Sequence, residues 1–164
     1  MEYRVTFLNG SEKLKEEGLK ILQSVRDDLD LLLFHFKKPL KEILQKLEDR
    51  FGVEIDPSQY CWYELDVLKE DILEEIERIL NEYPLCFDYV PDWGFFRYQI
   101  AWGGPQYEIR FYDNGLIEFA YLDWFVGVGF DVTEDQVFQR LKEVLEDSGS
   151  FEWAYKEAMS SISE

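Results

Sequence analysis

Histidine and cysteine are scarce in this sequence, which has one histidine and two cysteines among its 164 residues. Cys61 and Cys86 lie far apart and neither belongs to a CxxC pair, so we expect two free thiols buried in the core. With His35 as the one histidine, the chain has too few ligands for a structural zinc site. The position of His35 in the apolar run LLLFHF, near a predicted helix end, favours a packed or capping role over that of a catalytic base. We therefore expect neither a metal nor a cofactor.

Long apolar runs and nucleotide-binding motifs are absent as well. No stretch of about 18 apolar residues could span a membrane, and residues 1–10 lack the basic start and apolar stretch of a signal peptide. We therefore expect a cytoplasmic protein with no membrane contact. The patterns GxxxxGK[ST], GxGxxG and HExxH do not occur, so no phosphate-binding loop or zinc-protease helix is predicted. A content of 46% hydrophobic and 17% aromatic residues excludes a disordered chain and predicts a single domain over residues 1–164.

Basic residues become rare after residue 63. Residues 1–63 have 12 acidic and 10 basic residues, a net charge of −2, whereas residues 64–164 have 23 acidic and 7 basic residues, a net charge of −16. A surface with this charge repels nucleic acid and anionic membranes and attracts basic proteins. General solubility or adaptation to high salt would also explain an acidic composition. Salt adaptation would have to be local, because lysine remains common in the first third of the chain.

The spacing of apolar residues predicts an α+β fold. A short strand is expected at residues 3–8, and helical periods predict three helices, at residues 11–36, 40–51 and 65–83. Ser11 is the predicted N-cap of the first of these helices. The near-neutral residues 1–63 are thus expected to form a mainly helical part of the domain.

From residue 95 the apolar period falls to about two, which is typical of strands. Asp113-Asn114-Gly115 separates two alternating runs and predicts a hairpin turn. We expect an antiparallel three- to four-stranded meander, with its fourth strand at residues 126–132, packed against N-terminal and C-terminal helices. Thr133 and Gln136 predict a capping box for a helix at residues 134–146, and a last short helix begins near residue 150.

A row of acidic side chains follows one side of the third predicted helix. It consists of Asp66, Glu70, Glu74 and Glu77, which are three or four residues apart. Carboxylates four residues apart on a helix are separated by about 6 Å along its axis, a few-ångström spacing like that of charges on a nucleic-acid backbone. Proteins that imitate DNA need such a row on a rigid scaffold, although an ordinary solvated helix face gives the same pattern. Further acids belong to the next acidic helix: Glu134, Asp135, Glu143, Glu146 and Asp147.

Acidic residues also stand beside tryptophans, in Asp92-Trp93, Asp123-Trp124 and Glu152-Trp153. Two carboxylates in an aromatic cleft would be typical of a glycosidase. Adjacent residues of a strand point to opposite faces, however, so we expect each tryptophan to be in the core and each acid to be exposed.

A nuclease is the enzymatic alternative. Pro91-Asp92, followed by Glu108-Ile109-Arg110, loosely matches the PD-(D/E)xK layout of metal-dependent nucleases, in which carboxylates hold a cation and a lysine assists the attacking water. Arginine occupies the lysine position here, and it stays protonated and cannot take the same role. The negative charge would also oppose a DNA substrate. A solvated strand face is therefore the favoured interpretation of Glu108 and Arg110, and we expect no catalytic residues.

The segment from Trp102-Gly103-Gly104-Pro105 to Tyr121-Leu122-Asp123-Trp124-Phe125 resembles a WGGP…DWF pattern of small proteins carried by phages and plasmids. The similar region covers about residues 95–133. The resemblance implies a phage or plasmid context, hence the cytoplasm of a host cell, and it implies no catalytic residues. In overall character the chain is also similar to acidic anti-restriction and anti-CRISPR proteins.

These observations predict a non-enzymatic acidic inhibitor that binds the basic nucleic-acid-binding surface of a defence nuclease or CRISPR complex, as a DNA mimic, without contacting nucleic acid itself. The row from Asp66 to Glu77, with Glu134 and Asp135, would pair with the basic partner. Trp102 and Trp124, beside Asp123, would be packing residues or hot-spot anchors. Two alternatives stay open: an immunity protein that neutralises a basic toxin nuclease, and a small metal-dependent hydrolase or nuclease that uses Asp92 and Glu108.

Overall fold

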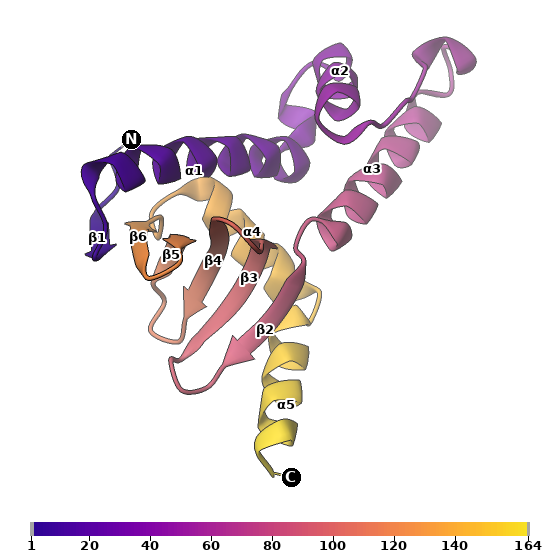
Figure 1. Cartoon of the computed structure of the whole chain (residues 1–164). Helices are drawn as coiled ribbons and strands as arrows, with labels where there is room; N and C mark the ends of the chain where they lie inside the picture. Colours follow the sequence, from indigo (N-terminus) through magenta and orange to yellow (C-terminus); the bar gives the residue numbers. More distant parts are fainter. Residues whose placement is uncertain (1, 164) are drawn as a thin grey trace. The chain divides into compact units, whose positions relative to one another are not determined.

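The computed structural model describes residues 2–163 and confirms an α+β fold. The chain divides into two compact units. The sheet unit contains Met1–Arg26 and Pro84–Glu164, and the helical unit contains Asp27–Tyr83. Helix α1 (Glu12–Leu33) contributes its first part to the sheet unit and its last part to the helical unit (Figure 1).

The sheet has six antiparallel strands in the described part of the chain, in the order β1-β6-β5-β4-β3-β2, which corrects the expected three to four. The strands are β1 (Val5–Leu8), β2 (Cys86–Val90), β3 (Phe95–Ala101), β4 (Gln106–Tyr112), β5 (Ile117–Asp123) and β6 (Val126–Asp131). The two additional strands lie at the edges. The short β2 begins only four residues after a helix, and β1 pairs with a strand more than a hundred residues later in the sequence. The strand expected at residues 3–8 is confirmed as β1, although its pairing with β6 was not predicted, and the local apolar period did not indicate β2.

The predicted hairpin turn is confirmed between β4 and β5. Gly115 has a φ of 94°, a conformation that glycine adopts without strain. The side-chain oxygen of Asn114 accepts a hydrogen bond from the Leu116 N–H at 3.0 Å. Side chains two residues apart along a strand share one face of the sheet. Residues that lie opposite each other in the antiparallel register also share a face.

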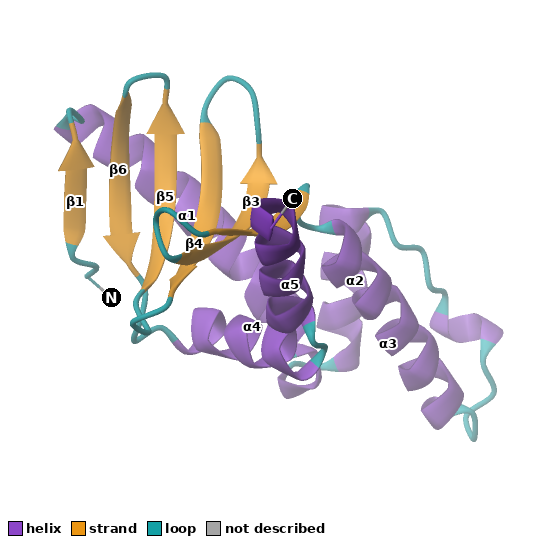
Figure 2. Cartoon of the chain, turned by 90° about the horizontal axis from the view of Figure 1, so that it is seen from below, coloured by secondary structure: helices purple, strands orange, loops and turns teal. Residues whose placement is uncertain are grey.

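Helices cover one face of the sheet (Figure 2). A Cβ on Gly18 of α1 would lie 3.1 Å from the side chains of Val128 and Phe130, so this helix packs directly on β6. Two C-terminal helices follow the sheet, α4 (Gln136–Asp147) and α5 (Ser150–Ser163). Phe151 of α5 packs edge-on against aromatic rings of three strands, those of Phe87, Phe96 and Phe111.

The N-cap of α4 is Asp135, not Thr133. The hydroxyl of Thr133 donates a hydrogen bond to Asp131 at 2.6 Å and accepts one from the Ile117 N–H at 3.0 Å. The Thr133 hydroxyl therefore bonds to residues of β5 and β6 and does not cap α4. The predicted capping box with Gln136 is wrong.

The helical unit has a core of its own. It comprises the last part of α1, the helices α2 (Leu40–Phe51) and α3 (Leu65–Glu82), and the 3-10 turns η1 (His35–Lys37) and η2 (Pro57–Gln59). Its buried residues are Leu31, Leu32, Ile43, Leu47, Val53, Leu68, Ile72, Ile76 and Ile79. This corrects the expected packing of all helices against the sheet, because the apolar sides of α2 and α3 pack with the end of α1.

Side-chain hydrogen bonds also connect the elements of the helical unit. Arg50 donates hydrogen bonds to both carboxylate oxygens of Asp28, at 2.8 and 2.9 Å, and Tyr83 donates a third at 3.2 Å. His35 Nδ1 lies 3.0 Å from the Leu32 carbonyl oxygen, which fits the expected capping role. Cys61, like Cys86 in the sheet unit, is exposed, so the expectation of buried thiols is wrong.

Candidate functional site

The acidic row of α3 lies on the surface of the helical unit. Asp66, Glu70, Glu74 and Glu77 are all exposed, and the opposite side of the helix carries the buried residues Leu68, Ile72, Ile76 and Ile79. None of the four carboxylates has a hydrogen bond or an ion pair with any residue that the structure describes. The row is thus a line of free negative charge.

The two basic residues of α3 do not neutralise this row. Arg78 pairs with Glu75 at 2.7 Å and with Glu82 at 3.0 Å, both outside the row. The ammonium group of Lys69 lies 5.8 Å from the centre of the Phe36 ring, in a cation–π contact. Both cations therefore have partners on other sides of the helix.

An exposed aromatic pair directly precedes the same helix. Trp62 is 92% exposed, and its ring packs edge-on against Tyr63 with ring centres 5.6 Å apart. Sequence reasoning missed this pair, although its place between a turn and the first residue of the acidic helix was the available signal. Exposed aromatic residues beside charges are typical of interaction surfaces.

The acids predicted at the start of α4 separate into an exposed and a buried residue. Glu134 is exposed, but Asp135 is completely buried. Asp135 accepts hydrogen bonds from the Val137 N–H at 2.9 Å, from the Tyr3 hydroxyl at 2.8 Å and from Arg26 Nε at 2.8 Å. Burial and the hydrogen bond to Asp135 raise the pKa of Tyr3 to about 12. The carboxylate of Asp135 is therefore a structural group and contributes nothing to an exposed surface.

The predicted aromatic anchors lie at one end of the sheet. Trp102 follows β3 and Trp124 follows β5, and the antiparallel register places both turns at the same end (Figure 2). Trp124, at a φ of 57°, is 88% exposed, and Asp123 beside it is partly buried. Trp93 and Trp153 are exposed too, so the expectation that tryptophans beside acids belong to the core is wrong. Alternation failed for Trp93 and Trp124 because they lie in turns, where side chains need not alternate.

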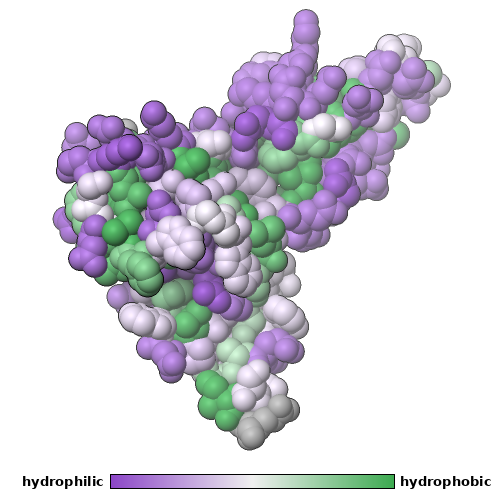
Figure 3. Space-filling model, viewed as in Figure 1, coloured by the Kyte–Doolittle hydropathy of each residue, from purple (hydrophilic) through white to green (hydrophobic). Residues whose placement is uncertain are grey.

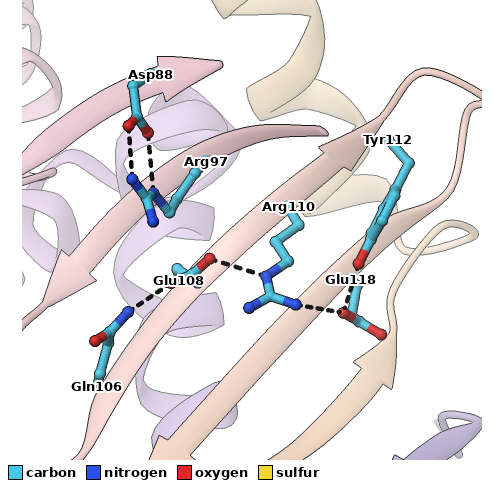
Figure 4. Close-up of polar contacts among 7 residues, drawn as sticks. All are labelled: Asp88, Arg97, Gln106, Glu108, Arg110, Tyr112 and Glu118. Carbon is cyan, nitrogen blue, oxygen red and sulfur yellow. Dashed lines mark hydrogen bonds and ion pairs between the residues drawn. The ribbon is translucent and has the colours of Figure 1, made fainter. Parts of the chain in front are cut away.

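A row of charged side chains crosses the face of the sheet opposite the helices. Each of five neighbouring strands contributes one residue, and the register aligns Asp88, Arg97, Arg110, Glu118 and Asp131. Figure 4 shows four of these side chains on the same face, in two pairs, Asp88 with Arg97 and Arg110 with Glu118. The sequence did not predict this row, because β2 was not among the expected strands and the alignment of the five residues depends on the register.

Both arginines of this row form close pairs with carboxylates. Arg97 donates two hydrogen bonds to Asp88, at 3.0 and 2.6 Å. Arg110 Nε donates to Glu108 at 2.8 Å, and Arg110 Nη1 lies 3.6 Å from Glu118 Oε1. The Arg110 guanidinium also lies 4.7 Å from the centre of the Phe95 ring. Glu108 is only 1% exposed, so the expected solvated strand face is wrong for this residue.

Glu118 is the least compensated of these carboxylates. Its pKa is raised because burial disfavours the charged form, and the opposing effect of Arg110 does not cancel this. Tyr112 donates a hydrogen bond to Glu118 Oε1 at 3.2 Å. Glu118 Oε2 has no hydrogen-bond or ion-pair partner among the described residues.

The two acids of the nuclease-like pattern are not brought together. Glu108 pairs with Gln99, whereas Asp92 lies in the turn beyond Phe95, at least four residues farther along the strand, a separation of about 13 Å. Glu108 is already bound by Arg110 and by Gln106, whose amide donates to it at 2.8 Å. Within residues 2–163 no three His, Cys, Asp or Glu side chains are grouped so that they could hold a metal ion.

Comparisons with protein-family models, curated proteins and solved structures found no match for this chain. No described helix combines the length and the apolar character that a membrane span requires.

Proposed function

We propose that this protein is a non-enzymatic acidic inhibitor that binds a basic nucleic-acid-binding surface of another protein, such as a defence nuclease or a CRISPR complex, and competes there with nucleic acid. The observation that supports this proposal is the row of free carboxylates on α3. Four exposed acids follow one side of a helix whose opposite side is anchored in the core of the helical unit.

The charge and geometry of the row suit such a partner. The 12 residues from Asp66 to Glu77 extend over about 16 Å of helix axis. Residues 27–83 contain 16 acidic and 7 basic residues, a net charge of −9, so the row lies within a negative field. Charges at this density attract a basic groove over a distance and raise the rate of association.

The aromatic pair next to the row would supply affinity. Trp62 and Tyr63 bury little area in the free protein, and large aromatic side chains are the residues that most often dominate binding energy at interfaces. We expect the carboxylates to orient the partner and Trp62 to anchor it.

The experiment compares two charge-reversal variants of equal net charge. In one, Asp66, Glu70, Glu74 and Glu77 become lysine. In the control, four exposed acids of the sheet unit, Glu16, Glu17, Glu146 and Asp147, become lysine. Each immobilised protein is used to capture proteins from a host-cell lysate, and the captured protein is purified and tested for DNA binding in the presence of the inhibitor.

The wild type and the control variant should capture a basic protein, release it at high salt and displace DNA from it, because the screening of exposed charges increases with ionic strength. The row variant should do none of these. Capture that persists in the row variant, or a captured protein that binds DNA equally well in the presence of the inhibitor, would contradict the proposal.

A further inference from the structure

The face of the sheet opposite the helices carries a groove that has no part in the acidic row of α3. Its volume is about 620 Å³, within the range of roughly 300–1,000 Å³ that is usual for ligand sites. Large apolar and aromatic side chains form much of its walls: Leu8, Trp93, Phe95, Leu122, Trp124 and Phe125. Figure 3 shows apolar and weakly polar side chains gathered over the strands in this part of the molecule.

Two glycines of β6 form the floor of the groove. A Cβ on Gly129 would lie 2.6 Å from Glu118 Oε2, and a Cβ on Gly127 would lie 2.7 Å from the side chain of Leu122. Both distances are too short for a real contact, so Glu118 and Leu122 occupy the space that side chains of β6 would fill. The groove therefore brings an apolar wall and a carboxylate together on bare backbone.

The groove offers one carboxylate oxygen to a ligand. Its charged lining residues are Glu118, Arg97 and Arg110, and the same face of the sheet also holds the carboxylates of Asp88, Glu108 and Asp131. Both arginines already bind carboxylates, so neither offers an unpaired charge to an anionic ligand. Glu118 Oε2 lacks a partner among the described residues and lies on the glycine floor. A donor that reaches the groove would meet this oxygen.

The aromatic walls of the groove favour a cation that carries an apolar chain. The exposed rings of Trp124 and Phe125 provide faces to which a cation is attracted and against which an aliphatic chain can pack. Arginine and lysine side chains combine an apolar stem with a charged head. A metal ion would find one free carboxylate oxygen and no second ligand pointing at the same place among the residues described.

We propose that this groove binds an arginine or lysine side chain from a basic segment of a partner protein, with the charged head on Glu118 and the stem against Trp124 and Phe125. This goes beyond the proposed function, because the groove belongs to the sheet unit and the acidic row to the helical unit. Either surface can fail its test alone.

The test titrates 15N-labelled protein with the blocked tripeptide acetyl-Gly-Arg-Gly-amide and follows the indole N–H signals of the five tryptophans by NMR. The corresponding citrulline peptide is the control, since it has nearly the shape of arginine without the charge. The arginine peptide should shift the signals of Trp93 and Trp124, which line the groove, and leave that of Trp62 unchanged. The citrulline peptide should bind at least roughly tenfold more weakly.

Three variants complete the test. Glu118→Gln removes the charge and keeps the shape, and Trp124→Gly removes an exposed ring at a backbone conformation that suits glycine. Each should weaken binding by roughly tenfold or more, and Trp124→Gly covers the case in which Glu118→Gln does not fold. The α3 variant with four lysines should bind the peptide normally. Equal binding of the citrulline peptide, full binding by Glu118→Gln, or no shift at about 10 mM peptide would overturn the proposal, whatever the result for the acidic row.

Discussion

Arg26 and Asp135 are 109 residues apart in the sequence, and Arg26 Nε donates a 2.8 Å hydrogen bond to the fully buried carboxylate of Asp135. The same carboxylate caps α4, so one side chain connects the start of that helix to α1. Removing a buried carboxylate that accepts three hydrogen bonds destabilises the folded state, because the three donors are left without their partner.

We therefore expect Asp135→Ala to lower the free energy of unfolding by about 3 kcal/mol, from the lost helix cap and the broken buried pair. The neighbouring exposed acid provides the control, and Glu134→Ala should change stability by no more than about 0.5 kcal/mol. Urea unfolding followed by circular dichroism measures both. Equal effects of the two substitutions would show that the carboxylate of Asp135 has no structural role.

Tyr89 provides a prediction at alkaline pH. Its hydroxyl donates a 2.6 Å hydrogen bond to Asp113, and this bond, together with burial, raises the pKa of Tyr89 from 10.0 to about 12. A raised pKa in the folded state means that the unfolded chain loses its proton first. Stability from this group is thus complete below pH 10 and is lost as the pH rises toward 12.

Tyr89→Phe should lower stability at neutral pH by about 1 kcal/mol, the usual value of one hydrogen bond. Between pH 10 and about 12 it should lose less stability than the wild type, because the titrating group is gone. Urea unfolding at several pH values gives both results. Parallel curves for the two proteins would mean that Tyr89 titrates normally.

Tyr98 is the opposite case. It is buried in the core of the sheet unit, and its hydroxyl has no hydrogen-bond partner in the described part of the chain. A buried polar group without a partner destabilises the folded state. We expect Tyr98→Phe to leave stability unchanged or to raise it by up to about 1 kcal/mol, in contrast to Tyr89→Phe. A loss of more than about 1 kcal/mol would reveal a partner for the Tyr98 hydroxyl.

Features that depend on neighbouring residues were predictable from the sequence, and those that depend on distant residues were not. The turn at Asn114-Gly115 and the cap at Ser11 depend on neighbouring residues, and both were predictable; Ser11 Oγ accepts a hydrogen bond from the Leu14 N–H at 3.3 Å. The N-cap of α4 was not, because Thr133 and Asp135 are equally suitable caps by residue type. Contacts with Ile117 on another strand decide between them.

The candidate sites follow the same division. Helical spacing predicted the exposed row from Asp66 to Glu77, since a regular helix fixes which residues share a side. The charged row from Asp88 to Asp131 needed the register of five strands, which turn lengths and long-range pairing set. The glycine floor could not be predicted from the sequence either, because Gly129 forms a floor only where the strand register places Glu118 beside it.

The exposure of both cysteines gives a prediction that needs no substitution. Cys61 and Cys86 are free and accessible in the folded chain. Ellman's reagent should therefore modify two thiols per chain without denaturant, at nearly the rate seen in urea. Protection of one thiol, with release on unfolding, would show that a residue counted as exposed is covered in solution.

Glu118 provides the last prediction, since its oxygen Oε2, which has no partner among the described residues, bears on the proposed binding of a basic side chain. Burial raises the pKa of Glu118, so ionisation of this residue weakens folding: its stability contribution is complete below the unfolded-state pKa and falls as the pH rises through the folded-state pKa. Glu118→Gln should thus be at least as stable as the wild type at pH 7 and should lose less stability between pH 4 and pH 7. Asp135→Asn, at a carboxylate bound by three donors, should instead destabilise the protein at pH 7. If Glu118→Gln proved strongly destabilising, the carboxylate would be a structural partner of Arg110 and Tyr112, as Asp135 is of Arg26. If it is neutral or stabilising, the fold keeps a charge that it does not need, which is the expected property of a residue kept for binding.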